Sequence, residues 1–257
     1  PVFRLTPLPE KTLIAERLGL DALIVLPFDA ATARMEAKAF IEEWLVSRLG
    51  ISAVVIGTDF CFGARRQGTS EMLKREGARL SFDVEILPEV ATSGAGRVSS
   101  SAVRQALETG DIELASELLG HRWFVTGEVR HGEKRGRELG FPTANLRLDA
   151  SCRLRHGIYA VRALIEGRVH DGVASFGRRP TFDNGAPLLE VFVLEFEGDL
   201  YGRSLTVEFV GWIRAEERFD SVEALVARMR ADVVEARLGL AAAAQGADAS
   251  VFEKQIA

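Results

Sequence analysis

The sequence predicts an α/β domain with a parallel sheet, followed by an antiparallel β-barrel that a C-terminal helix closes. Three observations support this prediction. Helical and apolar-strand patterns alternate through the first 120 residues, which is typical of a parallel sheet with crossover helices. Short β-rich runs then follow, separated by Gly, Pro, Asp and Asn, as in antiparallel sheets. A helical stripe of apolar residues begins after Asp220.

The first domain is expected to cover residues 1–120. Its predicted elements are a helix over 10–18, a strand over 22–28, a helix near 33–49, a strand over 51–56 and an apolar run over 80–87. Ser99 or Ser100 can cap a further helix that runs to about Thr109, because a hydroxyl oxygen accepts from the free N–H groups of a first turn. Asp111 can cap the next helix, and Gly120 suits its C-terminal end.

The second domain is expected to cover residues 121–237. Its predicted strands lie at about 122–130, 157–166, 168–176, 188–197 and 204–212. Asp220 stands before Ser221-Val222-Glu223 in a capping-box arrangement. The closing helix is indicated by the apolar stripe Val222, Leu225, Met229, Val233 and Ala236. The remaining tail, residues 238–257, is expected to form a weak helix or a frayed end.

The composition favours a soluble cytoplasmic protein and weighs against a membrane protein or a general nucleic-acid binder. The chain has 257 residues, 47% of them hydrophobic, yet no apolar run approaches the roughly 18 to 20 residues that a membrane helix needs. No secretory signal is visible, and two cysteines and four histidines give neither a disulfide framework nor a zinc pattern. A net charge of −5 weighs against general nucleic-acid binding.

The most informative segment is a glycine-rich, basic stretch over residues 127–145. Glycines allow backbone N–H groups to approach an anion closely, and basic side chains can balance its charge. The glycines are Gly127, Gly132, Gly136 and Gly140, and the basic residues are Arg130, Lys134, Arg135 and Arg137. The pattern indicates a phosphate-binding loop.

The glycine-rich stretch runs directly into Pro142-Thr143-Ala144-Asn145. An extended chain sends residues two apart to the same face, so the Thr143 hydroxyl and the Asn145 amide oxygen can meet one ion. Two neutral oxygens suit Mg²⁺ that nucleotide phosphates already hold. The alternative is a glycine-rich hairpin with an Asn-containing turn.

Residues 127–145 resemble the signature of the riboflavin kinase family. The resemblance covers about residues 121–237 and continues in the expected order through His156-Gly-Ile-Tyr-Ala160, Gly172-Val-Ala-Ser-Phe-Gly177-Arg-Arg-Pro-Thr181, Glu190, Asp199-Leu-Tyr-Gly202 and Arg214-Ala-Glu-Glu-Arg-Phe-Asp220. It implies a kinase barrel that converts riboflavin and ATP to FMN and ADP with Mg²⁺. By resemblance, Thr143 and Asn145 bind the metal, and the loop with Gly127, Gly132, Lys134 and Gly136 binds ATP.

Glu190 is the candidate general base. In the predicted strand 188–197 it shares a face with Phe192, Leu194 and Phe196, and an acid in an apolar series requires an explanation because unpaired burial disfavours its charge. The resemblance implies that it takes the proton of the riboflavin 5′-hydroxyl. The alternative is a strand-end carboxylate that reaches solvent. Arg214 and Glu217 are candidate flavin contacts, or a surface ion pair.

The segments Gly57-Thr-Asp-Phe-Cys-Phe-Gly63 and Val98-Ser-Ser-Ser-Ala-Val-Arg104 resemble the adenylyltransferase half of bacterial bifunctional riboflavin kinase/FAD synthetases. This implies a partial Rossmann-type, nucleotidyltransferase-like domain that joins FMN and ATP into FAD. Ser99, Ser100 and Arg104 would hold ATP phosphates at a helix N-terminus, although such serines are more often only helix caps. Phe62 would contact flavin, although phenylalanine is usually core.

The family also has an early His-x-Gly-His segment, which this sequence lacks. The four histidines are His121, His131, His156 and His170, all in the barrel region. We expect the printed sequence to be a fragment rather than the first domain to be a relic, because the other motifs are intact; the FAD synthetase activity of the chain as printed is therefore doubtful. The competing class of function is a non-catalytic barrel that binds flavin or nucleic acid through residues 130–137.

Overall fold

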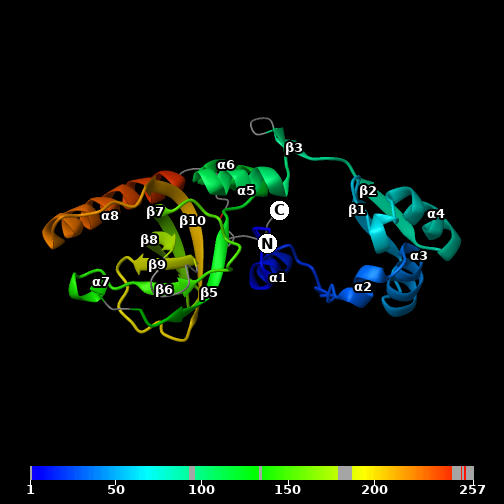
Figure 1. Cartoon of the computed structure of the whole chain (residues 1–257), viewed down its shortest axis with the longest axis horizontal. Coiled ribbons are helices and arrows are strands. Elements are labelled where there is room, and N and C mark those ends of the chain that lie inside the picture. Colours follow the sequence, from blue (N-terminus) through cyan, green and yellow to red (C-terminus); the bar gives the residue numbers. More distant parts are fainter. Residues whose placement is uncertain are drawn as a thin grey trace. The chain divides into compact units, whose positions relative to one another are not determined.

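The computed structural model describes residues 2–92, 96–132, 135–178, 187–244, 250 and 252. Its contacts divide the chain into two compact units. The α/β unit is Ile24–Ala91, and the barrel unit consists of Pro1–Leu23 and Thr92–Ala257. Figure 1 shows the elements in chain order. This partition differs from the domain boundary expected at residue 120, which stays a prediction.

The α/β unit contains a parallel pair of strands, β1 (Ala53–Gly57) and β2 (Asp83–Leu87), in register from Ala53 opposite Asp83 to Gly57 opposite Leu87. This confirms the parallel pairing that the alternating pattern predicts. Its helices are α2 (Ala30–Arg34), α3 (Ala37–Ala39), η1 (Phe40–Arg48), η2 (Ala64–Arg66) and α4 (Ser70–Leu80). Ile41, Ile56, Phe62, Leu73 and Phe82 form the centre of its core.

Two predictions for the first domain are wrong. Residues 22–28 form no strand, and Phe28 is 85% exposed. No strand of the described sheets lies beside this segment, and an isolated apolar run cannot hold strand geometry in water. The helix expected over 33–49 is interrupted at Met35, whose carbonyl accepts from the Ala64 N–H at 2.7 Å instead of from a following helical turn.

The barrel unit includes three helices that precede its sheet: α1 (Leu8–Arg17), α5 (Ser100–Thr109) and α6 (Ile112–Leu119). The predicted caps are confirmed. Ser99 accepts from the Ala102 N–H at 3.2 Å, and Asp111 accepts from the Leu114 N–H at 3.0 Å. Gly120 ends α6 in the left-handed conformation, with φ of 74°, where glycine avoids a Cβ clash. The short strands β3 (Ala91–Thr92) and β4 (Gly96–Arg97) precede α5 in the chain.

Six antiparallel strands close into a barrel in the order β10-β5-β6-β9-β8-β7, which confirms the predicted barrel. They are β5 (Phe124–Arg130), β6 (Ala144–Arg147), β7 (Gly157–Ile165), β8 (Arg168–Arg178), β9 (Pro187–Val193) and β10 (Ser204–Arg214). Strand β6 and the short helix α7 (Arg135–Glu138) were not predicted. On β9, Leu189, Val191 and Val193 belong to the core, so Glu190 and Phe192 face outwards because strand residues alternate.

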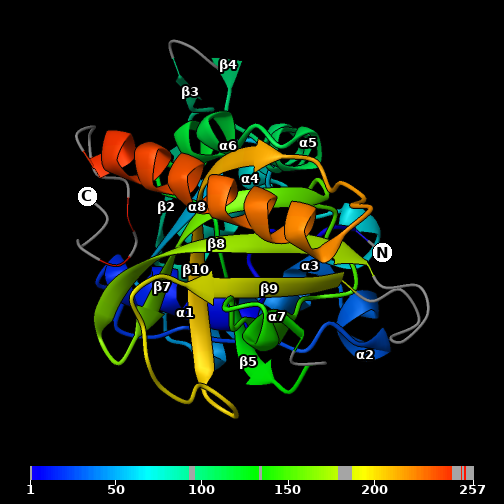
Figure 2. The ribbon, with the colours of Figure 1, turned by 90° about the vertical axis from the view of Figure 1, so that its left-hand side faces the viewer.

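A long helix, α8 (Val222–Ala244), lies across the outer face of the barrel strands (Figure 2). Ala236 and Leu240 are buried against Ala160 of β7. The Ser221 hydroxyl accepts from the Ala224 N–H at 3.1 Å, so Ser221, one residue later than expected, caps this helix. The predicted apolar stripe therefore meets the outer face of the barrel rather than its interior.

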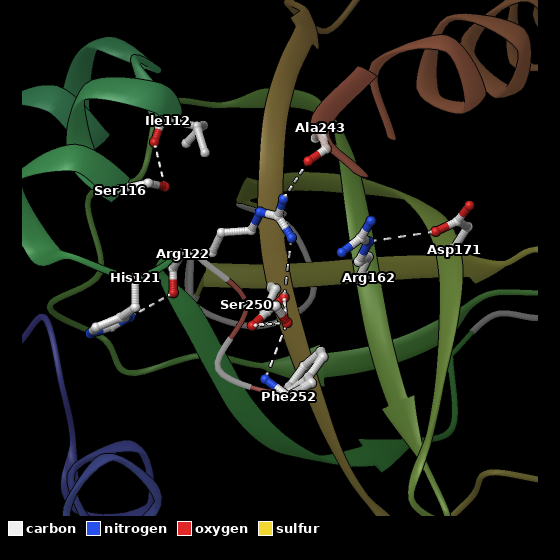
Figure 3. A network of polar contacts seen from close by, with 10 residues as sticks. Ile112, Ser116, His121, Arg122, Arg162, Asp171, Ala243, Ser250 and Phe252 are labelled. Carbon is white, nitrogen blue, oxygen red and sulfur yellow. Dashed lines mark hydrogen bonds and ion pairs between the residues drawn. The ribbon is translucent and has the colours of Figure 1, made fainter. Parts of the chain in front are cut away.

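Ser250 and Phe252 are buried on the barrel, so the expectation of a frayed end is wrong for these two residues (Figure 3). The Ser250 hydroxyl lies 3.0 and 2.9 Å from the two carboxylate oxygens of Glu208, a β10 residue with 0% exposure. Arg122 lies 4.0 Å from the same carboxylate and donates to the Ala243 carbonyl at 3.3 Å. A buried acid requires such partners, and the tail supplies one of them.

Candidate active site

The central feature of the site is a row of cross-strand neighbours on the outer face of the barrel. Glu190 of β9 stands opposite Asn145 of β6 on one side and opposite Ser175 of β8 on the other. Directly opposed residues have Cβ atoms about 4.5 to 5.5 Å apart and share a face. The register therefore brings together a carboxylate, an amide and a hydroxyl that are far apart in the sequence.

The same row continues around the barrel in both directions. Asn145 pairs with Arg130 of β5, and Ser175 pairs with Ile158 of β7, which in turn pairs with Arg214 of β10. Arg214, singled out in the sequence as a flavin contact, therefore lies at the same level of the barrel as Glu190. The backbone ladders fix both positions.

A pocket of about 310 Å³ lies over this row, between the barrel face, the segment around α7 and helix α8. Its volume is at the lower end of the range for small-molecule sites. It contains five residues singled out from the sequence: Gly136, Thr143, Glu190, Arg214 and Glu217. Its other lining residues are largely apolar: Leu139, Phe141, Ile158, Val173, Ser175, Phe192, Glu216, Phe219, Leu225, Met229, Asp232 and Val233.

Glu190 is half-buried on the pocket side of β9. The expected face shared with Leu194 and Phe196 is wrong, because β9 ends at Val193 and Glu195 adopts a φ of 54°. Phe192 does share the face of Glu190 and contacts Phe141, with ring centroids 5.2 Å apart. Glu190 thus shares the outer, pocket-lining face of β9 with Phe192 and lies outside the barrel core.

Two of the predicted glycines lie against the predicted metal ligands. A Cβ at Gly132 would come within 2.6 Å of the Asn145 amide nitrogen and 2.8 Å of its oxygen. A Cβ at Gly136 would lie 2.4 Å from the Phe141 carbonyl oxygen and 3.8 Å from the Thr143 hydroxyl. Only glycine lets the loop backbone approach these side chains so closely. Asn145 is buried, and its amide nitrogen donates to the Thr143 carbonyl at 3.2 Å, which orients the amide.

Arg214 is held at the pocket by Asp232 of α8. Its Nε and Nη2 donate to the two carboxylate oxygens of Asp232, both at 2.7 Å. These bonds raise the pKa of the Arg214 guanidinium above its usual value. Glu217 lies 3.9 Å from Arg214 and is half exposed. The expected Arg214–Glu217 pair is therefore a loose contact beside a much tighter one with Asp232.

The other residues singled out from the sequence lie away from the lining of this pocket or outside the described residues. Gly127 packs on Leu146, because a Cβ at Gly127 would lie 3.4 Å from the Leu146 side chain. Ser99 is a helix cap and Ser100 opens α5, while the Arg104 Nε donates to the Phe3 carbonyl at 2.7 Å. Phe62 is a core residue of the α/β unit, stacked on Phe60 at 5.5 Å. Lys134 lies outside the described residues.

Sequence reasoning did not single out Ser175 or Asp232. Ser175 stands inside the quoted motif 172–181, but only the strand register reveals that it neighbours Glu190. Asp232 could have been noticed as an acid next to Val233 of the apolar stripe of the last helix, since a charge there needs a partner.

The described part of the chain contains no group of three or more His, Cys, Asp or Glu side chains placed to bind a metal ion. None of its helices combines the length and the apolar character that crossing a bilayer requires.

Comparison with known proteins places both halves of the chain in one enzyme family. The riboflavin kinase family model matches residues 119–240, and the FAD synthetase model matches residues 1–102. The bifunctional riboflavin kinase/FMN adenylyltransferase of Haemophilus influenzae is 40% identical over 235 residues, which are 91% of this chain and 76% of that protein. The Escherichia coli K12 and Bacillus subtilis proteins of the same description are 39% and 36% identical, covering 91% and 92% of this chain and 75% of each relative.

A solved structure from Streptococcus pneumoniae, described as a macrolide-efflux protein, is 32% identical with a TM-score of 0.77 and covers 91% of this chain and 75% of that one. This likeness supports the fold over most of the chain. The chain belongs to the family of bifunctional riboflavin kinase/FMN adenylyltransferases, enzymes of FMN and FAD biosynthesis.

Proposed function

We propose that the pocket between the barrel and α8 is where riboflavin is phosphorylated by ATP to give FMN and ADP. The observation that carries the proposal is the row Asn145–Glu190–Ser175 with the glycine loop set against Asn145. Phosphoryl transfer depends mostly on positioning and charge neutralisation. The row of polar side chains held by the strand ladders, with the loop backbone close beside it, supplies the positioning.

Glu190 is the proposed general base. As the riboflavin 5′-hydroxyl oxygen forms its bond to the γ-phosphorus of ATP, the bond from that phosphorus to the ADP oxygen breaks, and Glu190 accepts the hydroxyl proton. Its place on a strand favours this role, because the ladders to β6 and β8 hold its backbone on both sides. Phe192, on the same strand face, and Phe141, packed against it, supply apolar surface to the pocket that Glu190 lines.

Thr143 and Asn145 are the proposed holders of Mg²⁺. Both side chains lie on the outer face of the β6 segment, and the Asn145 amide is fixed by the Thr143 carbonyl. Neutral oxygens fit a metal that arrives with nucleotide phosphates, and the Gly132 and Gly136 backbone leaves no room for a side chain beside them. When bound, the metal would neutralise phosphate charge.

The apolar part of the pocket is the proposed flavin site. Phe192, Phe219 and Met229 offer a wall suited to a flat heteroaromatic ring, and Arg214 and Glu217 offer polar contacts at its edge. Large apolar surface with a few placed polar groups is typical of small-molecule sites.

The second reaction, adenylylation of FMN by ATP to give FAD, is proposed for the first domain, residues 1–120. Ser99, Ser100 and Arg104 are the proposed phosphate contacts, and Phe62 is a proposed flavin contact. The Arg104 Nε donates to the Phe3 carbonyl. The other N–H groups of its guanidinium are the proposed donors to phosphate oxygens. A cytoplasmic location is part of the same proposal.

One assay separates the kinase from a barrel that only binds flavin. The chain is incubated with riboflavin, ATP and Mg²⁺, and the products are resolved by chromatography. We expect FMN and ADP in equal amounts. Riboflavin binding without any FMN would contradict the kinase assignment and favour the binding module.

A further inference from the structure

Asp232 is a nearly fully buried carboxylate on α8 that borders the pocket. It is 3% exposed, and its oxygens lie 2.7 Å from the Nε and 2.7 Å from the Nη2 of Arg214. Arg228, one turn earlier on α8, places its Nε 3.2 Å from the same carboxylate. Burying a carboxylate is costly unless it is paired. Asp232 is therefore stable at this position because it pairs with the guanidinium groups of Arg214 and Arg228.

The contact between Asp232 and Arg214 is bidentate, with two parallel N–H donors meeting two oxygens. Such a fork fixes the plane of the guanidinium as well as its position. The Arg214 Nη1 also donates to the Ala215 carbonyl at 2.9 Å. Of the five N–H groups of an arginine, three are used within the protein, and one each remains on Nη1 and Nη2.

We propose that Asp232 is a positioning residue of the riboflavin kinase reaction. It acts through Arg214, holding the guanidinium so that its two remaining N–H groups can donate to carbonyl oxygens of the isoalloxazine ring. The inference rests on the proposed function, because it takes this pocket as the flavin site.

The competing partner of Arg214 explains why a positioning residue is needed. Glu217 lies 3.9 Å from the Arg214 Nη1 and is half exposed. Without the bidentate contact to Asp232, the Arg214 guanidinium would turn towards Glu217 and donate its remaining N–H groups to that carboxylate. Flavin would then lose its hydrogen-bond donors, while Glu190 and Thr143 would keep their places on the sheet.

The test compares Asp232→Asn with Glu235→Gln in the full 257-residue chain. Asparagine keeps the shape of the side chain but presents an N–H₂ group to one guanidinium donor, which breaks the fork. Glu235 is the matched control, because it lies on the same helix and forms its ion pair with Arg228, at 3.2 Å, and not with Arg214. Riboflavin and ATP are varied separately, and FMN formation is measured.

We expect Asp232→Asn to raise the KM for riboflavin by about tenfold or more, with kcat and the KM for ATP changed by less than about threefold, because the lost contact serves flavin binding. Glu235→Gln should leave all three values unchanged. In an Arg214→Ala background, Asp232→Asn should add less than about twofold, since the residue it acts through is gone. An unchanged riboflavin KM in Asp232→Asn, or full additivity with Arg214→Ala, would overturn the inference.

If Asp232→Asn does not fold, Arg214→Lys decides the matter. Lysine keeps a positive charge beside Asp232 but cannot form the fork, so the same rise in riboflavin KM is expected, and its absence would overturn the proposal. The two levels of failure are distinguishable. No FMN from the unaltered chain would overturn the proposed function together with this inference, whereas normal FMN formation with an unchanged riboflavin KM in these variants would overturn the inference alone.

Discussion

Glu190 and Asn145 stand directly opposite each other on neighbouring antiparallel strands, β9 and β6. The backbone register of the two strands thus brings the proposed base and the proposed metal-binding amide together. Their placement does not depend on long, flexible side chains. A slip of one residue in either strand would turn that strand's polar residue to the barrel interior. The geometry of the proposed kinase site is therefore set by the sheet.

Replacing Glu190 with Gln should lower the rate of FMN formation by about 10²- to 10⁴-fold, the usual worth of a positioned general base. ATP binding should persist, because in the proposed reaction Glu190 contacts the 5′-hydroxyl of riboflavin and not ATP. Steady-state kinetics and calorimetry measure the two effects. Glu197→Gln, an exposed acid beyond the end of β9, serves as the control. A loss smaller than about tenfold would remove Glu190 from the role.

Thr143→Ala and Asn145→Ala should each weaken ATP binding more in the presence of Mg²⁺ than in its absence, because the lost oxygens face the metal. A loss of about 1 to 3 kcal/mol is expected for each buried polar contact. Calorimetric titration with ATP, with and without Mg²⁺, checks this. Equal losses in both conditions would indicate a collapsed loop instead, and unchanged riboflavin binding is the internal control.

Gly132→Ala should raise the KM for ATP by about tenfold or more, since displacement of a positioning group by even 1 Å is costly. Its new methyl group would lie 2.6 Å from the Asn145 amide nitrogen, so the amide or the loop must move. Gly239→Ala is the matched control: it lies in α8 with nothing within 4 Å of its Cβ. That change should leave activity intact and stabilise the helix by up to about 1 kcal/mol. Normal ATP kinetics in Gly132→Ala would contradict the proposed phosphate-binding role of this glycine-rich loop.

Glu10→Gln should become more stable relative to the unaltered chain as the pH rises. Glu10 of α1 is 3% exposed, its Oε1 accepts from the Thr126 N–H at 2.6 Å, and its Oε2 has no hydrogen-bond partner among the described residues. Burial is the main cause that raises the pKa of this carboxyl above 4.5. The folded state therefore holds the proton more tightly than the unfolded state.

The sign of this dependence follows from linkage. The contribution of Glu10 to stability is fully present below pH 4.5, the unfolded value, and is lost as pH rises through the higher folded pKa. Glutamine keeps the acceptor for Thr126 and never ionises. Urea unfolding of both proteins from about pH 4 to pH 8 measures the difference. A difference that stays constant, or that favours glutamate at high pH, would contradict the prediction.

Local chemistry was enough to predict much of the fold. Ser99, Asp111 and Gly120 fix helix ends through contacts within a few residues, so their sequence context alone identifies them. Five of the six barrel strands are indicated by short β-rich runs that Gly, Pro, Asp and Asn separate. Glycine spacing and an extended chain are also local features, and the structure places Gly132 against Asn145 and Gly136 near Thr143, while the metal role of the last two stays a prediction.

Contacts between distant segments could not be predicted in the same way. Strand β6 has four residues, too few for a periodic signal, and exists because β5 and β9 pair with it. The Asp232–Arg214 fork joins a helix to a strand eighteen residues away. The run 22–28 has a strand composition, but a strand needs a neighbour, and the described sheets provide none.

Alternate residues of β9 serve two different requirements, because one set packs the barrel core and the other lines the outer pocket. Leu189 and Val191 fill the barrel, whereas Glu190 and Phe192 face the pocket beside α8. Cores tolerate exchanges that conserve volume, so the inward positions can drift among aliphatic residues while the ladders keep the outward ones in place. Randomising Phe192 and Val173, which line the pocket, should therefore alter its ligand preference without a redesign of the barrel core.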